Sequence, residues 1–155
     1  METPKIWIDA DSCPVQVRNH TVKTAARLGI QVFFVANKPI PCAESPFEMI
    51  ICPQQKDAAD SYILEHAGAA DLVITRDIVF ADRLVEKGIA AINDRGTTFT
   101  SENIKELLSD RDFDLALSQA GVVKSLRYGY EKKDFEKFAN CFDRVLHRLL
   151  TRHQG

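Results

Sequence analysis

The chain has 155 residues and a formal net charge of −2, with 45% hydrophobic and 27% charged residues. A chain of this length and composition folds as one globular domain with its own core, which excludes wholesale disorder. No apolar run is long enough to span a bilayer and no signal-peptide pattern opens the chain, so we expect a cytoplasmic protein without membrane association.

Five apolar runs read as β-strands, and each stops at a polar residue or a proline. They are near-continuous rather than alternating, which is typical of strands covered on both faces, as in parallel sheets. In chain order they occupy residues 6–8, 30–36, 48–52, 71–75 and 89–92.

Three helical patterns lie between these strands, at residues 15–28, 57–67 and 78–87, and each is followed by a glycine. Regular alternation of strand and helix predicts an α/β fold with a doubly wound, mostly parallel sheet of about five strands.

The last third of the chain is helical in pattern. Thr100 or Ser101 is placed to cap one helix, and apolar residues recur at three- and four-residue steps between residues 135 and 150. We therefore expect one domain over residues 1–155, with residues 121–155 as a helical extension. Its apolar stripe would pack on the domain or on a second copy in a homodimer.

Charge is divided unevenly along the chain. Residues 1–120 contain 12 Lys and Arg against 18 Asp and Glu, whereas residues 121–155 contain 8 against 4. The basic surplus is either a solvated helix surface or a patch that meets nucleic-acid phosphates.

Acidic residues follow the strands at the edge where an open parallel sheet binds its ligands. Asp9 and Asp11 come after the first strand and Asp77 after the fourth. Asp57 and Asp60 open the helix before the fourth strand, three residues apart and so on one helix face. Asp57 is also placed as a helix cap, so which of the two faces the other acids stays open.

Carboxylates brought this close repel one another unless a cation lies among them. Mg²⁺ or Mn²⁺ suits such hard oxygen donors. We predict Asp9, Asp60 and Asp77 as metal ligands, close enough to share an ion, with Asp9, Asp11 and Asp77 as the catalytic group.

Several polar residues near the same edge are candidates for holding substrate phosphate or a metal-bound water. For Ser12 and Thr75 the alternative is helix capping, and for the cations it is an ordinary surface position. The candidates are Ser12, Asn37, Lys38, Thr75, Arg76 and Arg95, together with Lys132 and Lys133 in the basic extension.

Two phosphatase patterns match incompletely. Asp9-Ala10-Asp11 resembles the D-x-D-x-T/V nucleophile loop of haloacid-dehalogenase-type phosphatases, but Cys13 occupies the fifth place. Cys13 and Arg18 resemble a tyrosine-phosphatase loop with one residue too few between them and no glycines to cradle a phosphate.

Taken together, five segments resemble the YaiI/YqxD family of small bacterial proteins, over nearly the whole chain. They are Ile8-Asp9-Ala10-Asp11-Ser12-Cys13-Pro14-Val15, Val35-Ala36-Asn37, Asp57-Ala58-Ala59-Asp60, Val73-Ile74-Thr75-Arg76-Asp77 and Asn93-Asp94-Arg95-Gly96, with residues 138–143 in support. The resemblance implies a fold related to PIN and NYN nuclease domains.

By that relationship Asp9, Asp60 and Asp77 are similar to the acids with which PIN nucleases bind one or two Mg²⁺ or Mn²⁺ ions and hydrolyse RNA. The chain departs from the PIN pattern in lacking a clear Glu as second acid. Three hypotheses follow: a metal-dependent ribonuclease-like enzyme, a non-catalytic PIN-like module that binds RNA, and a small-molecule phosphatase with Asp9 as nucleophile.

Overall fold

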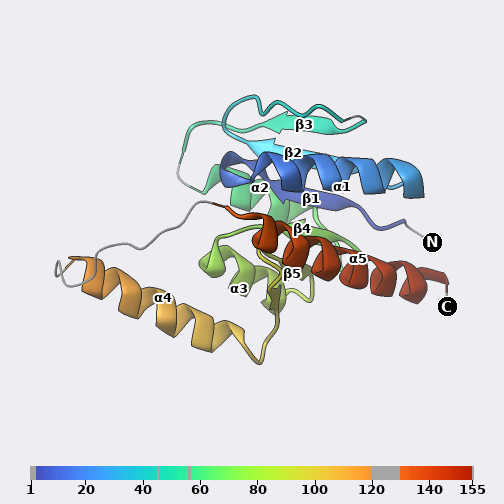
Figure 1. Cartoon of the computed structure of the whole chain (residues 1–155). Helices are drawn as coiled ribbons and strands as arrows, with labels where there is room; N and C mark the ends of the chain where they lie inside the picture. Colours follow the sequence, from blue (N-terminus) through green and yellow to red (C-terminus); the bar gives the residue numbers. More distant parts are fainter. Residues whose placement is uncertain (1–2, 45, 56, 120–129, 155) are drawn as a thin grey trace.

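The protein is a three-layer α/β/α domain built on one six-stranded sheet (Figure 1). The computed structural model describes residues 3–44, 46–55, 57–119 and 130–154, and for residues 12, 113–119 and 152–154 it describes the backbone only. The strands lie in the order β3-β2-β1-β4-β5-β6. The chain therefore begins in the middle of the sheet, winds first toward one edge and then toward the other.

The first five strands are parallel. Their bounds are Ile6–Asp9 for β1, Val32–Ala36 for β2, Glu48–Ile51 for β3, Leu72–Ile74 for β4 and Ala90–Ile92 for β5. Strand β1 pairs with β2 on one side and with β4 on the other, so Ile8 lies opposite both Phe34 and Ile74. The prediction of a doubly wound, mostly parallel sheet is confirmed.

A sixth strand, β6 (Thr98–Phe99), pairs antiparallel with β5 and was not predicted. It is two residues long, too short for a periodic pattern. It forms because the chain turns back at Gly96, whose φ of +86° is a left-handed conformation that glycine adopts without strain.

Two hydrophobic cores cover the two faces of the sheet. Ile6 and Ile8 face α1 (Val15–Leu28) and α5 (Lys132–Gln154). Trp7 between them faces α2 (Ala58–His66) and α3 (Ile78–Glu86). Successive strand residues point to opposite faces, so burial on both sides explains the continuous apolar runs.

The helices begin and end close to where the sequence patterns predicted. Helix α1 has the predicted bounds and ends at Gly29, which is left-handed at φ +72°. Helix α4 (Ile104–Gln119) is capped by Thr100 and Asn103, each of which accepts a hydrogen bond from the backbone N–H of the other. Thr100, rather than Ser101, is therefore the residue that caps it.

Helix α5 returns from the carboxyl edge of the sheet and packs beside α1 (Figure 1). Its fully buried residues Phe138, Phe142 and Leu146 complete the core on that face. The apolar stripe thus packs on the domain itself. The expected connection at residues 121–130 lies almost wholly outside the described residues.

Within the described part of the chain, no helix has the length and apolar character needed to cross a membrane.

Candidate functional site

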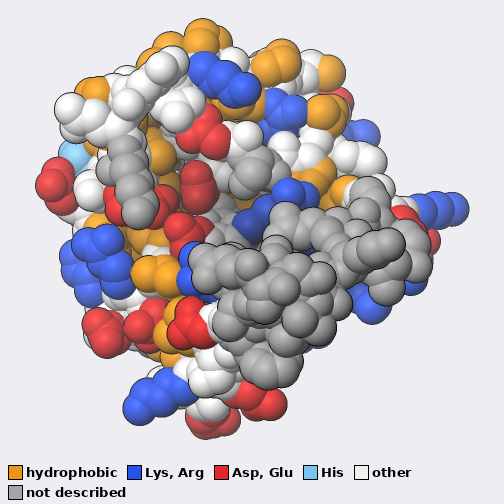
Figure 2. All heavy atoms as spheres, turned by 90° about the vertical axis from the view of Figure 1, so that its left-hand side faces the viewer, with side chains coloured by type: hydrophobic (Ala, Val, Ile, Leu, Met, Phe, Trp, Pro, Cys, Tyr) orange, Lys and Arg blue, Asp and Glu red, His pale blue; other side chains and the backbone are white. Residues whose placement is uncertain are grey.

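The carboxyl edge of the sheet is the face on which the predicted residues lie. Strand order reverses between β1 and β4, and the loops after these neighbouring strands leave the sheet in opposite directions. This is where open α/β sheets bind their ligands. Figure 2 faces this edge, and several acidic side chains gather near the middle of it.

Asp9 and Asp77 are joined by the hydroxyl of Thr75. Thr75 Oγ1 donates to Asp9 Oδ2 at 2.9 Å and accepts from the backbone N–H of Asp77 at 3.1 Å. The Asp77 carboxylate also caps α3, with Oδ1 accepting from the N–H of Phe80 at 3.2 Å. Thr75 is buried, so this network fixes the ends of β1 and β4 relative to each other.

Asp60 is the acid of α2 that faces the same site. Its side chain is 8% exposed, whereas Asp57 is exposed. Asp57 is the N-cap residue of α2 but makes no side-chain capping bond, and its backbone is left-handed at φ +64°. The structure thus favours Asp60 over Asp57 as the inward acid, and Asp57 occupies the expected N-cap position without a side-chain capping bond.

Burial first, and neighbouring negative charge second, raise the pKa of two of these acids. Burial raises the pKa of Asp9 to about 6, the Thr75 hydrogen bond lowers it, and the charges of Asp11 and Asp77 raise it. Burial, together with the charges of Asp9, Asp77 and Asp57, raises the pKa of Asp60 to about 7. The acids also raise one another's pKa by like charge, which places them in the same region of the sheet edge.

Asp11 lies on the outer side of this cluster, on the single turn η1 (Ala10–Ser12) after β1. It is exposed, and both its carboxylate oxygens accept from the backbone N–H of Asn37, at 3.2 and 3.3 Å. Asp11 therefore ties the end of β1 to the end of β2. It acts on Asp9 by charge rather than by contact.

A separate network of ion pairs joins β5 to the start of α5. Arg76 pairs with the buried Asp94, whose backbone carbonyl accepts from the hydroxyl of Tyr130. Arg95 lies over the Tyr130 ring, 5.9 Å from its centroid, and 3.8 Å from Asp134. Two predicted phosphate-binding cations thus have acidic partners within the fold.

The remaining predicted substrate residues are less constrained. Asn37 and Lys38 are exposed after β2, and Lys132 and Lys133 are exposed at the first turn of α5. Lys133 lies 3.4 Å from Glu131. The side chain of Ser12 lies outside the described part of the structure.

Cys13 is unsuited to act as a thiolate nucleophile. Burial raises the pKa of its thiol to about 12, so the thiol stays protonated at neutral pH. This agrees with the imperfect match of Cys13 and Arg18 to a tyrosine-phosphatase loop.

The donor atoms of the acidic cluster fit Mg²⁺ or Mn²⁺ in kind. They are carboxylate oxygens, and among the described residues no cationic side chain forms an ion pair with Asp9, Asp60 or Asp77. In geometry the fit is incomplete, because no three His, Cys, Asp or Glu side chains in the described ranges converge as a metal site. The metal ligands therefore stay a prediction.

Two residues near the site were not singled out from the sequence. In the sequence, Asp94 is one residue of a polar segment that follows a strand, and Arg83 lies within a helical pattern with no mark that sets it apart. The charge of Arg83 lowers the pKa of Asp60 from the neighbouring helix. The sequence gives no signal for this proximity, because it depends on which helices lie side by side.

Comparison with known proteins bears directly on the identity of the chain. The model of a family described as "Uncharacterized BCR, YaiI/YqxD family" matches residues 7–148. The chain belongs to the YaiI/YqxD family. The chain is similar to a UPF0178 protein of Treponema denticola, with 44% identity over 146 residues that cover 94% of both chains.

Two further relatives support the same assignment. A UPF0178 protein of Treponema pallidum is 44% identical over 94% of this chain and 82% of its own length. One of Ectopseudomonas mendocina is 40% identical over 94% of this chain and 98% of its own. No solved structure matches this YaiI/YqxD chain. The resemblance deduced from its motifs is thus confirmed at the level of the family.

Proposed function

We propose that this protein hydrolyses RNA phosphodiesters with the help of Mg²⁺ or Mn²⁺ bound by Asp9, Asp60 and Asp77. The observation that carries the proposal is that the buried Asp60 and the half-buried Asp9 and Asp77 lie near the switch point of the sheet, with Thr75 linking Asp9 to the backbone of Asp77. Burial and like charge hold the pKa of Asp9 at about 6 and that of Asp60 at about 7. A fold retains such a cluster at a cost in stability, which a cation would offset.

Each residue has a part that follows from its contacts. Asp9 is held by the Thr75 hydroxyl, and Asp77 is held at the N-terminus of α3, so their carboxylates are pre-oriented. Asp60 completes the donor set from α2, and Asp11 adds negative charge beside Asp9. When bound, the ions would activate water and stabilise the leaving oxygen.

A second candidate is an RNA-binding module of the same fold without turnover. It is favoured by one observation, that no three ligating side chains in the described residues converge as they stand. The acids would then serve structure or bind a cation weakly. The phosphatase hypothesis is weaker, because its nucleophile loop is incomplete at Cys13.

The test combines melting and cleavage. We expect 10 mM Mg²⁺ or 1 mM Mn²⁺ to raise the Tm by a few degrees, since a ligand of the folded state adds stability by mass action, and about 1 kcal/mol corresponds to about 2–4 °C in a domain of this size. Wild-type protein with Mn²⁺ should also cut a mixed single-stranded RNA pool.

Asp77→Asn is the informative variant, because asparagine keeps the cap of α3 while removing the charge. It should lose most of the metal response and the cleavage, whereas the control Asp82→Asn on the same helix should keep both. Binding of RNA without cleavage by the wild type would establish the second candidate. If the wild type shows no RNA binding and no RNA cleavage, the RNA function is refuted.

A further inference from the structure

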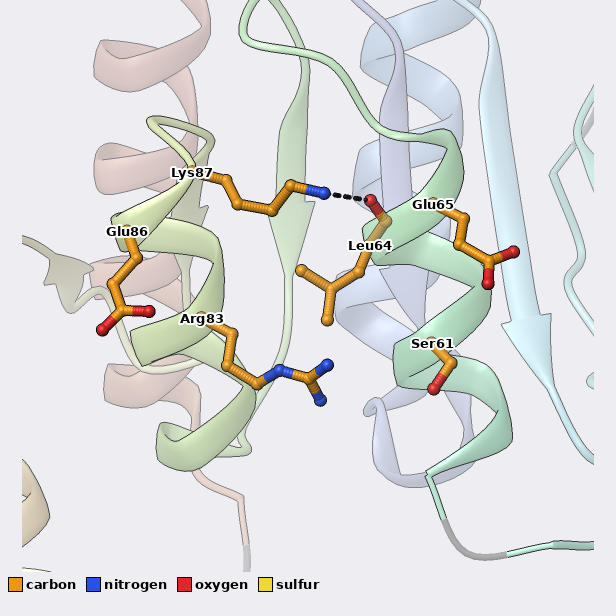
Figure 3. Close-up of a pocket in the computed structure, with 6 residues that line it drawn as sticks. All are labelled: Ser61, Leu64, Glu65, Arg83, Glu86 and Lys87. Carbon is orange, nitrogen blue, oxygen red and sulfur yellow. Dashed lines mark hydrogen bonds between the residues drawn. The ribbon is translucent and has the colours of Figure 1, made fainter.

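A groove of about 360 Å³ runs between α2 and α3 on the outer side of the sheet (Figure 3). Ser61, Leu64 and Glu65 line it from α2, and Arg83, Glu86 and Lys87 line it from the end of α3. Leu64 is buried and forms an apolar wall, while the other five side chains are exposed. The groove is therefore a shallow open channel with polar rims.

The charged side chains around the groove are oriented by sign. Figure 3 shows Arg83 and Lys87 reaching from α3 across toward α2, whereas Glu65 and Glu86 point outward, away from the space between the helices. Lys87 Nζ donates to the backbone carbonyl of Leu64 at 2.8 Å. The interior of the groove is thus positive although its lining residues have no net charge.

Arg83 is the cation in this groove that remains available to a ligand. Lys87 is engaged by the free carbonyl at the end of α2, where cations are favoured. Among the described residues, the Arg83 guanidinium makes neither a hydrogen bond nor an ion pair. Its planar fork matches the geometry of a phosphate group.

The two helices that form the groove also carry acids of the cluster or begin at one. Ser61 follows Asp60 directly, and Leu64 is four residues beyond it and hence on the same face of α2. Helix α3 starts from Asp77, so both walls of the groove lead back to predicted ligands. The influence of the Arg83 charge on Asp60 fits this proximity.

We propose that the groove between α2 and α3 holds the single-stranded RNA next to the phosphodiester at the acidic cluster, with Arg83 binding a neighbouring phosphate. This inference rests on the proposed function and names how its substrate is positioned. Arg83 attracts phosphate, whereas the acidic cluster repels phosphate unless a cation is bound there. A polymer with successive phosphates can place one at Arg83 and the next at the cation-loaded cluster. Arg83 is a substrate-positioning residue in this scheme.

The experiment compares Arg83→Gln with Arg83→Lys and with the control Arg27→Gln. Arg27 is exposed in the last turn of α1, at the opposite edge of the sheet from the acidic cluster. Binding of a labelled 12-nucleotide RNA is measured by anisotropy across a salt series. Cleavage is measured with Mn²⁺ on that RNA and on a dinucleotide, which has no neighbouring phosphate.

We expect Arg83→Gln to weaken binding of the long RNA about tenfold, the lower end of what a charge-assisted hydrogen bond contributes. The slope of log affinity against log salt should fall by roughly 0.7, as for one lost phosphate contact to a single strand. KM for the long RNA should rise by a larger factor than kcat falls. Arg83→Lys should restore the slope and part of the affinity, and Arg27→Gln should behave as wild type.

Cleavage of the dinucleotide should be equal in wild type and Arg83→Lys, which keeps the positive charge near Asp60. Arg83→Gln should lose clearly more activity on the long RNA than on the dinucleotide. An equal loss on both substrates would overturn the inference, because Arg83 would then act through the charge of Asp60. Unchanged binding and cleavage of the long RNA by Arg83→Gln would overturn it too, and leave the proposed function standing. If wild type neither binds nor cuts RNA, both proposals fail.

Discussion

Asp60 combines burial with like charge, and this makes the stability of the protein depend on pH. Its pKa is raised from 3.8 to about 7 in the folded protein. Between these values the folded state binds more protons than the unfolded state. The contribution of the protonated Asp60 carboxyl to the free energy of unfolding is therefore fully present below about pH 4 and is lost as the pH rises through 7.

The variant Asp60→Asn should reduce this decline and leave the smaller part that comes from the raised pKa of Asp9. Without added metal, it should be more stable than wild type at pH 7.5 by about 1–3 kcal/mol, given that one pKa unit corresponds to about 1.4 kcal/mol and the group is coupled to its neighbours. Urea unfolding in EDTA from pH 4 to 8 measures it, with the exposed Asp110→Asn as control. Parallel curves for wild type and Asp60→Asn would contradict the assignment.

Thr75 governs the orientation of Asp9 through a single hydroxyl. Thr75→Val keeps the shape of the side chain but leaves the N–H of Asp77 and one oxygen of Asp9 without this partner. We expect a loss of about 1–3 kcal/mol in stability and a pKa of Asp9 above its present value of about 6, because the hydrogen bond lowers it.

An NMR titration of the Asp9 carboxyl together with urea unfolding checks this expectation. Thr75→Ser, which retains the hydroxyl, is the matched control and should keep the pKa of Asp9. If Thr75→Val leaves both the pKa and the unfolding free energy unchanged, the hydroxyl does not orient Asp9.

At the scale of elements, α5 is positioned by a close approach to the turn between β5 and β6. A Cβ at Gly96 would lie 2.6 Å from the backbone oxygen of Lys137, closer than any packing allows. The hydroxyl of Tyr130 and the Arg95–Asp134 pair fix the start of α5 at the same turn. The C-terminal helix is thus an integral layer of the domain.

Gly96→Ala should therefore lower the free energy of unfolding by more than the backbone strain of an alanine at positive φ, because the added methyl group also clashes with Lys137. Gly88→Ala is the control, because Gly88 has φ +75° and open space around its Cβ position. We expect about 1–2 kcal/mol for Gly88→Ala from backbone strain and clearly more for Gly96→Ala, measured by urea unfolding. Equal losses would show that α5 yields to the added methyl group.

At the scale of the whole molecule, the acidic site and the exposed cations lie in different places. Lys132 and Lys133 are exposed at the start of α5, which Figure 1 places toward the carboxyl edge of the sheet. The basic extension also contains Lys124 and Arg127, for which we predict RNA contacts, and both lie outside the described residues. A long substrate would meet these cations only if it extends beyond the acidic cluster.

Charge reversal at Lys132 and Lys133 should weaken RNA binding and lower the salt slope by roughly 1.4, twice the value for one contact to a single strand. Metal-induced stabilisation should be unchanged, and negative charge at a helix N-terminus is compatible with the fold. Reversal of Arg144 and Arg148, exposed further along α5, is the control. Equal effects of the two pairs would assign the binding to diffuse charge.

Much of the architecture was accessible from the sequence because it depends on local patterns. Continuous apolar runs marked buried parallel strands, and glycines marked the ends of helices. The family was accessible from five short segments. Strand β6 was missed because its two residues pair only after Gly96 has turned the chain back.

The candidate site was accessible only in part. The sequence by itself determined that Asp9 and Asp77 lie at strand ends, because a strand ends where its apolar run ends. Tertiary structure decided that Asp60 rather than Asp57 is buried beside them, and that Arg76 pairs with Asp94. It also decided that Arg83 lies near Asp60. These last facts depend on how helices and loops distant in sequence pack against one sheet, and no local pattern encodes which charges then become neighbours.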